Sequence, residues 1–225
     1  MSPTVGILYA PGTNSHHETA FAFDRVGGSS SFVFMADLLA GRSRLDDFDI
    51  VCLPGGFAYG DHLGGGALAG ALLRERVGDQ LDAIASRPVL AICNGFQVAV
   101  RSGMFGDGIT LTVNDNATFQ NLPFQEHVVA DDADSPWLTG MEGETVTFPC
   151  AHGEGRFVAA TPEGERWRAA LHYPADRNPD GSAFDIAGIV SLDGLAFGLM
   201  DHPERAPDNE RAMTIFANGV AAAAT

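Results

Sequence analysis

Lysine is absent from this sequence of 225 residues, and all 13 of its basic side chains are arginines. Acidic side chains number 29, so the formal net charge is −16. A surface so short of positive charge repels phosphate backbones and anionic lipid headgroups. We therefore expect neither nucleic acid nor a membrane among the partners of this protein.

Long apolar runs and cysteines are also scarce. No stretch approaches the roughly 18 uncharged residues that a membrane-spanning helix needs, and residues 1–12 lack the basic segment of a secretory signal, so we expect a cytoplasmic protein. The three cysteines, Cys52, Cys93 and Cys150, are odd in number and lack C-x-x-C spacing. This pattern argues against a disulfide framework or a zinc site, and we expect no metal in this chain. One functional thiol remains to be found.

Short apolar runs alternate with helical patterns in the first half of the chain. Hydrophobic residues make up 45% and charged residues 19%, as in folded proteins, and no linker divides residues 1–225, which we interpret as one domain. Strands are predicted at 5–9, 31–35, 50–53 and 88–92, and helices at 66–86 and after Ser15, where Ser15 and Glu18 have the spacing of a capping box. This alternation predicts an α/β protein with a parallel sheet.

The second half has a different pattern. From Thr110 onward, strands and loops dominate, and Asp193-Gly194 between two apolar runs predicts a hairpin. We expect this half to add antiparallel strands to the same sheet.

Cys93 stands at the end of the apolar run 88–92 and precedes Asn94, Gly95 and a helical segment. A nucleophile at a sharp strand-to-helix turn is exposed above the sheet, as in α/β hydrolases. A helix N-terminus there stabilises a thiolate, and the N–H of Asn94 is placed to bind an oxyanion. A small buried cysteine is the alternative, but the position favours catalysis.

A catalytic thiol needs a base and a group that orients the base. Of seven histidines, His202 follows an apolar strand and is two residues from Glu204, with a proline between them. This spacing lets Glu204 reach the far ring nitrogen of His202. A second strand end carries Gly55-Gly56, and Gly56 is the natural second oxyanion donor.

Together these motifs resemble class I glutamine amidotransferases, and within them the family of glutaminase subunits of phosphoribosylformylglycinamidine synthase. The matching strings run through the whole chain: PGTN (11–14), PGGFAYGDHL (54–63), PVLAICNGFQ (88–97), AHGEGRFV (151–158), NPDGS (178–182), IAGI (186–189) and GLMDHPER (198–205). The resemblance implies a flavodoxin-like fold with a mostly parallel central sheet, flanking helices and additional antiparallel strands in the C-terminal half.

The resemblance also implies roles. Cys93 would form a γ-glutamyl thioester from glutamine and release ammonia, with His202 as acid and base and Glu204 orienting it. The oxyanion hole would be Gly56 and Asn94. The substrate-binding residues would be Gly55, Gln97, Ala151, His152 and Gly153. A large synthetase subunit, with ATP and magnesium, would use the ammonia to convert formylglycinamide ribonucleotide to the amidine, and bacterial complexes add a small third subunit. No cofactor is implied for this chain.

The chain departs from the family at several positions. Gly64 stands where arginine is usual, and Asp201 where proline is usual. The alternatives are a paralogous glutaminase serving another amidation, such as a specialised nucleoside pathway, a stand-alone thiol hydrolase of the same fold, and a non-catalytic subunit, which the intact Cys93, His202 and Glu204 oppose. Gly64 to Gly66 are expected to be flexible and to let the oxyanion loop change conformation.

Overall fold

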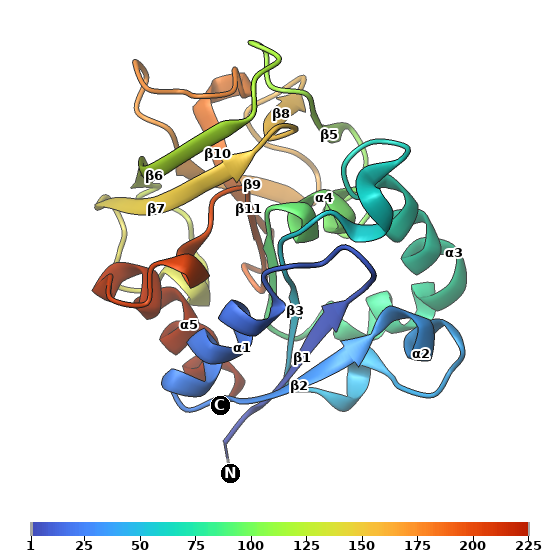
Figure 1. Cartoon of the computed structure of the whole chain (residues 1–225). Helices are drawn as coiled ribbons and strands as arrows, with labels where there is room; N and C mark the ends of the chain where they lie inside the picture. Colours follow the sequence, from blue (N-terminus) through green and yellow to red (C-terminus); the bar gives the residue numbers. More distant parts are fainter. Residues whose placement is uncertain (1, 225) are drawn as a thin grey trace.

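Nine strands form one mixed sheet in the computed structural model, which describes residues 2–224 (Figure 1). The strand order is β2-β1-β3-β4-β11-β10-β9-β6-β7. The parallel part consists of β2 (Ser29–Phe34), β1 (Thr4–Tyr9), β3 (Ile50–Leu53), β4 (Val89–Ile92) and β11 (Ala196–Leu199). The antiparallel part consists of β10 (Ile186–Ser191), β9 (Trp167–His172), β6 (Gln120–Val129) and β7 (Thr145–His152). A separate antiparallel pair joins β5 (Ile109–Thr112) to β8 (Arg156–Ala159).

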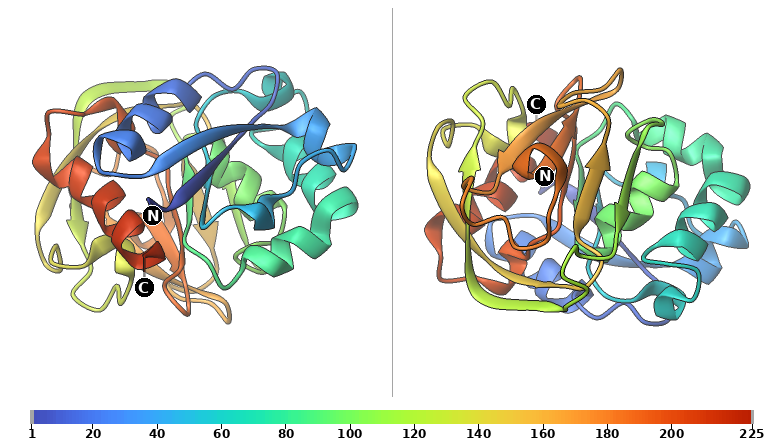
Figure 2. Two further views of the ribbon diagram at one scale, coloured as in Figure 1. Left: turned by 90° about the horizontal axis from the view of Figure 1, so that it is seen from below. Right: turned by 90° about the horizontal axis from the view of Figure 1, so that it is seen from above.

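Helices cover both faces of the parallel part. Figure 2 shows α1 and α5 to one side of the central strands and α2, α3 and α4 to the other. The bounds are α1 His16–Arg25, α2 Met35–Leu39, α3 Ala67–Ile84, α4 Asn94–Arg101 and α5 Glu210–Ala223. Short 3₁₀ turns lie at Leu45–Asp47, Ala58–Asp61, Pro136–Leu138, Ala183–Asp185 and Pro203–Arg205. Among residues 2–224, none of the helices combines the length and apolar character needed to cross a bilayer.

The strands β3, β4 and β11 end level with one another. Leu53 pairs with Ala91, and Leu199 pairs with Ile92, both in parallel register. All four residues of each of these strands are buried, because helices or neighbouring strands cover both faces. The segments that follow the three strands therefore begin at one edge of the sheet, which is where ligands bind in open α/β folds.

The predicted fold class is confirmed: the sheet is parallel in its first part, and the second half of the chain extends it with antiparallel strands. The hairpin at Asp193-Gly194 is present, and Gly194 has the positive φ (74°) that its turn requires. The predicted capping box is wrong. Ser15 precedes α1 without capping it, because its hydroxyl accepts a hydrogen bond from Arg205 Nη2 at 2.8 Å.

Candidate active site

Cys93 occupies the turn between β4 and α4, as the sequence predicts. Its backbone has φ 52° and ψ −112°, a conformation that costs a non-glycine residue on the order of 1–3 kcal/mol. Gly95 permits the tight packing behind the turn, since a Cβ there would lie 1.8 Å from the Leu53 carbonyl oxygen. The start of α4 therefore rests directly on the end of β3, and this holds the thiol at the edge of the sheet.

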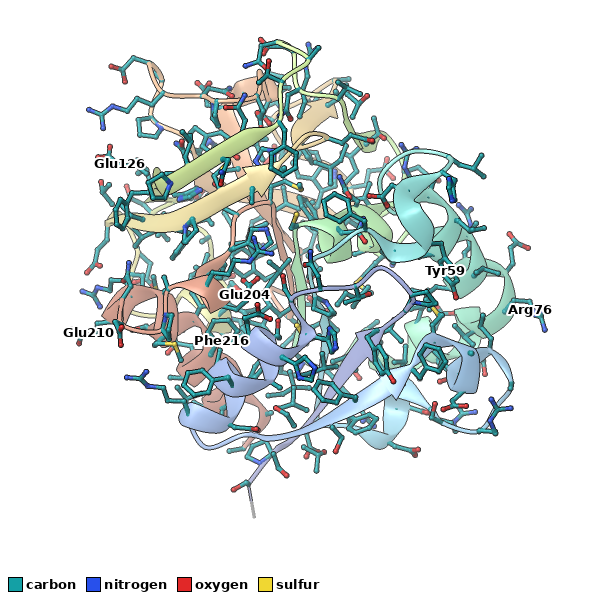
Figure 3. All side chains as sticks on the ribbon, viewed as in Figure 1. Tyr59, Arg76, Glu126, Glu204, Glu210 and Phe216 are labelled. Atoms are coloured by element: carbon teal, nitrogen blue, oxygen red, sulfur yellow. The ribbon has the colours of Figure 1, made fainter. Side chains whose placement is uncertain are left out.

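His202 and Glu204 lie beside this turn. The Nδ1 atom of His202 is 2.6 Å from Glu204 Oε1, and the His202 N–H donates to the Pro149 carbonyl at 2.8 Å. A Cβ on Gly55 would lie 2.8 Å from His202 Cε1 and 3.4 Å from Cys93 Cβ, so the imidazole and the cysteine flank the same glycine. Figure 3 places Glu204 between α1 and β7. The structure brings all three predicted catalytic residues together.

The electrostatics of His202 suit an acid. Burial alone lowers the pKa of His202, but the Glu204 carboxylate and Cys93 outweigh burial and raise this pKa to about 10. The ring is therefore an imidazolium at neutral pH. Its Nε2 atom makes no hydrogen bond of ordinary geometry among residues 2–224, so its proton is not committed to another protein group.

The other two cysteines are poorly suited to nucleophilic chemistry. Burial raises the pKa of Cys52 well above its usual value, and it also raises the pKa of Cys150. Both thiols therefore stay protonated in the protein alone. Cys93 is the thiol with an imidazole beside it.

The predicted oxyanion donors are the N–H groups of Asn94, directly after Cys93, and of Gly56, directly after the Gly55 that flanks Cys93. Asn94 is the first residue of α4, so its N–H has no partner within the helix. Gly56 has a φ of 148° and packs so closely on Thr13 that a Cβ would lie 2.6 Å from the Thr13 Cα. Within residues 2–224, neither N–H donates to a backbone carbonyl. The role of these two N–H groups as an oxyanion hole stays a prediction.

A network of side chains fixes the loop that carries Gly56. Asn94 Oδ1 accepts from the Ala58 N–H at 2.8 Å, and Asn94 Nδ2 donates to Asp61 Oδ1 at 3.0 Å and to Gln97 Oε1 at 2.8 Å. Gln97 Nε2 in turn donates to the Glu154 carbonyl at 2.8 Å. The Gln97 amide, predicted to contact glutamine, is thus engaged with the protein here, and its contact with substrate stays a prediction.

The glycine-rich segment after this loop is also anchored. Gly64 N–H donates to the Asp61 carbonyl at 2.9 Å, Gly65 N–H to Glu154 Oε2 at 2.8 Å, and Gly66 N–H to Asp61 Oδ1 at 3.1 Å. Three consecutive backbone donors are satisfied in this conformation, and the flexibility expected from the composition of this segment stays a prediction.

The predicted substrate strand lies at the end of β7. The Ala151 carbonyl accepts a weak hydrogen bond from Cys93 Sγ at 3.8 Å, which places this strand against the nucleophile. The Gly153 carbonyl accepts from the Asn114 N–H at 3.0 Å. The His152 side chain lies beside Asp201, with 3.4 Å between Nε2 and Oδ1. Binding of glutamine by this strand stays a prediction.

Sequence reasoning assigned no role to Asp61, Glu154 and Arg205. Asp61 and Glu154 hold the oxyanion loop, and Arg205 ties Ser15 to the segment after His202. All three lie within quoted strings, in GDHL, HGEGR and HPER. The motifs therefore contain these residues but do not reveal their contacts. Glu154 binds a residue 89 positions away in the sequence, and Arg205 binds one 190 positions away.

A cysteine on a strained backbone turn, beside a histidine–glutamate pair and two N–H groups without backbone partners, is the arrangement of a thiol enzyme that transfers acyl groups. The chain belongs to the CobB/CobQ-like glutamine amidotransferase domain family, whose model matches residues 2–218.

Several known proteins resemble the whole chain. It is 34% identical to the phosphoribosylformylglycinamidine synthase subunit PurQ of Dehalococcoides mccartyi, over 88% of this chain and 84% of the relative. Identity to the corresponding PurQ of Pyrococcus furiosus is 33%, over 89% and 87%. Among solved structures, a chain of PurLQS from Thermotoga maritima is 31% identical with a TM-score of 0.82, and 97% of each chain is covered.

Proposed function

We propose that this chain is the glutaminase subunit of a phosphoribosylformylglycinamidine synthase. It hydrolyses glutamine to glutamate and ammonia and delivers the ammonia to a synthetase subunit. One observation carries the proposal: Cys93, His202 and Glu204 meet beside two free N–H groups, in a chain 34% identical to a PurQ subunit over 88% of its length.

The first step is acyl transfer to sulfur. The Cys93 thiolate attacks the side-chain amide carbon of glutamine, and the carbonyl oxygen takes the negative charge. The Gly56 and Asn94 N–H groups stabilise this oxyanion. The imidazolium of His202 gives its Nε2 proton to the amide nitrogen, the C–N bond breaks, and ammonia leaves a γ-glutamyl thioester.

The second step is hydrolysis. Neutral His202 takes a proton from water, and the resulting hydroxide attacks the thioester carbon. The C–S bond breaks, glutamate forms, and the Cys93 thiolate and the His202 imidazolium are restored. Glu204 stabilises the imidazolium at 2.6 Å in both steps and does not itself carry the transferred proton.

The ammonia then reaches a large subunit that uses ATP and magnesium to convert formylglycinamide ribonucleotide to the amidine. Its likeness to a chain of PurLQS supports assembly with a synthetase subunit and with a small third subunit, and a cytoplasmic location follows from that biosynthetic role.

A paralogous glutaminase for a different amidation is the second candidate. Gly64 and Asp201 favour it, since both differ from the residues usual in the family and lie at the oxyanion loop and beside His202. The two candidates share the glutaminase chemistry and differ in the acceptor.

The test measures glutamate release by this chain with its cognate large subunit, ATP and one acceptor at a time. Formylglycinamide ribonucleotide is expected to give amidine, glutamate and ADP together. Ammonium chloride in place of glutamine is the control, because it supports the synthetase without the glutaminase. Amidation of another acceptor alone would favour the paralogue, and glutamine hydrolysis that no synthetase alters would indicate a stand-alone hydrolase.

A further inference from the structure

A second cluster of buried reactive side chains lies behind the catalytic residues. Cys150 and His152 are two residues apart on β7, so both side chains project from the same face of the strand. Asp201 reaches them from the segment after β11, immediately before His202. Cys150 Sγ lies 3.3 Å from His152 Nε2, which lies 3.4 Å from Asp201 Oδ1. All three residues are at most 2% exposed.

We propose that Cys150, His152 and Asp201 bind a divalent transition-metal ion of the zinc type. One sulfur, one imidazole nitrogen and one carboxylate oxygen form a donor set that suits zinc. The three ligand atoms lie within 4.8 Å of one another. Ligands bonded at 2.0–2.3 Å around a tetrahedral ion are about 3.3–3.7 Å apart, which matches the two spacings above.

The surrounding residues orient these ligands. His127 Nε2 lies 2.6 Å from Asp201 Oδ2, so one carboxylate oxygen is held by an imidazole. The other oxygen, Asp201 Oδ1, is buried without a hydrogen bond among residues 2–224 and faces His152. Asp180 Oδ2 lies 3.8 Å from His152 Nε2, so a second carboxylate faces the imidazole from outside the set of three ligands. Groups that hold a ligand in this way strengthen metal binding.

A cation would add to the partners that the buried carboxylates already have, which are His127 for Asp201 and Ser182 for Asp180. The thiol and both carboxylates are buried, and an ionised carboxylate or thiolate is costly to bury without a partner. A bound divalent ion displaces the Cys150 proton and compensates the resulting charge. Without an ion, the cluster is a hydrogen-bonded network of Asp201 with two histidines, which is the alternative that the experiment must distinguish.

The site differs from the catalytic one in its ligands and in its role. Cys150 and His152 flank Ala151, whose carbonyl contacts Cys93, and Asp201 precedes His202. An ion there would fix β7 relative to the catalytic histidine, and no step of glutamine hydrolysis passes through it.

The experiment uses the untagged full chain. Its active-site thiol is first blocked with a diazoketone analogue of glutamine, so that Cys93 cannot act with His202 as a competing metal site. The chelator-treated protein is titrated with cobalt(II) and zinc(II). We expect one ion per chain, a thiolate-to-cobalt charge-transfer band, the intense visible bands of tetrahedral cobalt(II), and a higher melting temperature with zinc(II).

Three variants locate the site. Cys150→Ala is expected to abolish the charge-transfer band, and His127→Gln to weaken binding about 10–100-fold while retaining the band. Cys52→Ala, at another buried cysteine, is the matched control and should bind as the parent does. The proposal would be overturned if the parent binds no ion, or if the charge-transfer band persists in Cys150→Ala. The first outcome holds even if a variant unfolds, because it is measured on the parent.

Discussion

At the level of single residues, the proposed chemistry depends on the proton that His202 holds. The ordinary pKa of histidine is 6.5, and in the folded protein that of His202 is about 10. The stabilisation from its pairing with Glu204 is therefore complete below pH 6.5 and is lost as the pH rises through about 10. A histidine that stays protonated across this range can donate to leaving ammonia at neutral pH.

Glu204→Gln removes the charge that opposes the effect of burial on His202. The pKa of His202 should then fall toward or below 6.5, and the basic limb of the pH profile of kcat/KM should move to lower pH. A profile with an unchanged basic limb would show that Glu204 does not set this pKa. Glu144→Gln, at an exposed ion pair with Arg211, is the matched control and should leave the profile unchanged.

Cys93→Ala should abolish glutamine hydrolysis, and His202→Ala should lower kcat by about 10²–10⁴-fold, because the proton transfers would lose their side chain. Glu204→Ala should cost at least about tenfold less than His202→Ala. The double variant Cys93→Ala/His202→Ala should be no worse than Cys93→Ala. Labelling by a diazoketone analogue of glutamine, located by mass spectrometry, must fall on Cys93, and a label on Cys52 or Cys150 would refute the assignment.

At the level of elements, the oxyanion loop depends on a contact from another part of the chain. Glu154 accepts from the Gly65 N–H, and its carbonyl holds Gln97. Glu154→Ala should lower kcat for glutamine about tenfold or more, because a small displacement of the Gly56 donor weakens transition-state binding. Glu142→Ala is the control, since that carboxylate holds a glycine N–H in an exposed turn. Equal kcat values for both variants would show that the contact is only structural.

The packing of α4 on β3 gives a prediction about stability. Gly95→Ala would place a methyl group 1.8 Å from the Leu53 carbonyl and should destabilise the fold by about 1–3 kcal/mol or more. Gly78→Ala in α3 meets nothing within 4 Å and should stabilise by about 0.5–1 kcal/mol. Urea denaturation of both variants measures the difference. A Gly95→Ala protein as stable as the parent would show that the turn after β4 can move away from the Leu53 carbonyl.

These elements also show what the sequence can and cannot predict. The strand at 50–53 is predicted to the residue, because an uninterrupted apolar run ends at Pro54-Gly55. The Cys93 turn follows from the same local reasoning. The cap of α1 is mispredicted because Ser15 binds Arg205, 190 residues away. The cluster around Asp201 also cannot be predicted from the sequence. His127 contacts Asp201 although 74 residues separate them, because the order of the antiparallel strands brings them together.

At the level of the whole molecule, the catalytic residues are enclosed. Cys93 is 7% exposed and His202 is 1% exposed, so little of the catalytic thiol is open to solvent in this conformation, and we expect glutamine entry to need movement of the surrounding loops. The loop with Gly56 and the strand end at Ala151 lie on either side of the nucleophile. Both reach the sheet edge where the chain segments after β3, β4 and β11 meet. A partner that docks on this edge can couple acceptor binding to glutamine entry.

The isolated chain should therefore hydrolyse glutamine slowly, and its large subunit loaded with ATP and acceptor should raise kcat. One oxyanion donor contributes about 10²–10³-fold to kcat, so a rise of up to about this size is expected if the partner completes the Gly56 side of the hole. Steady-state kinetics with and without the partner measure it, and Glu154→Ala should lose part of the rise. Gly64→Arg tests the tuning of the same loop, although φ at Gly64 is 103° and an arginine there is strained. An isolated chain that already turns over glutamine as fast as the complex would show that the partner does not control this site.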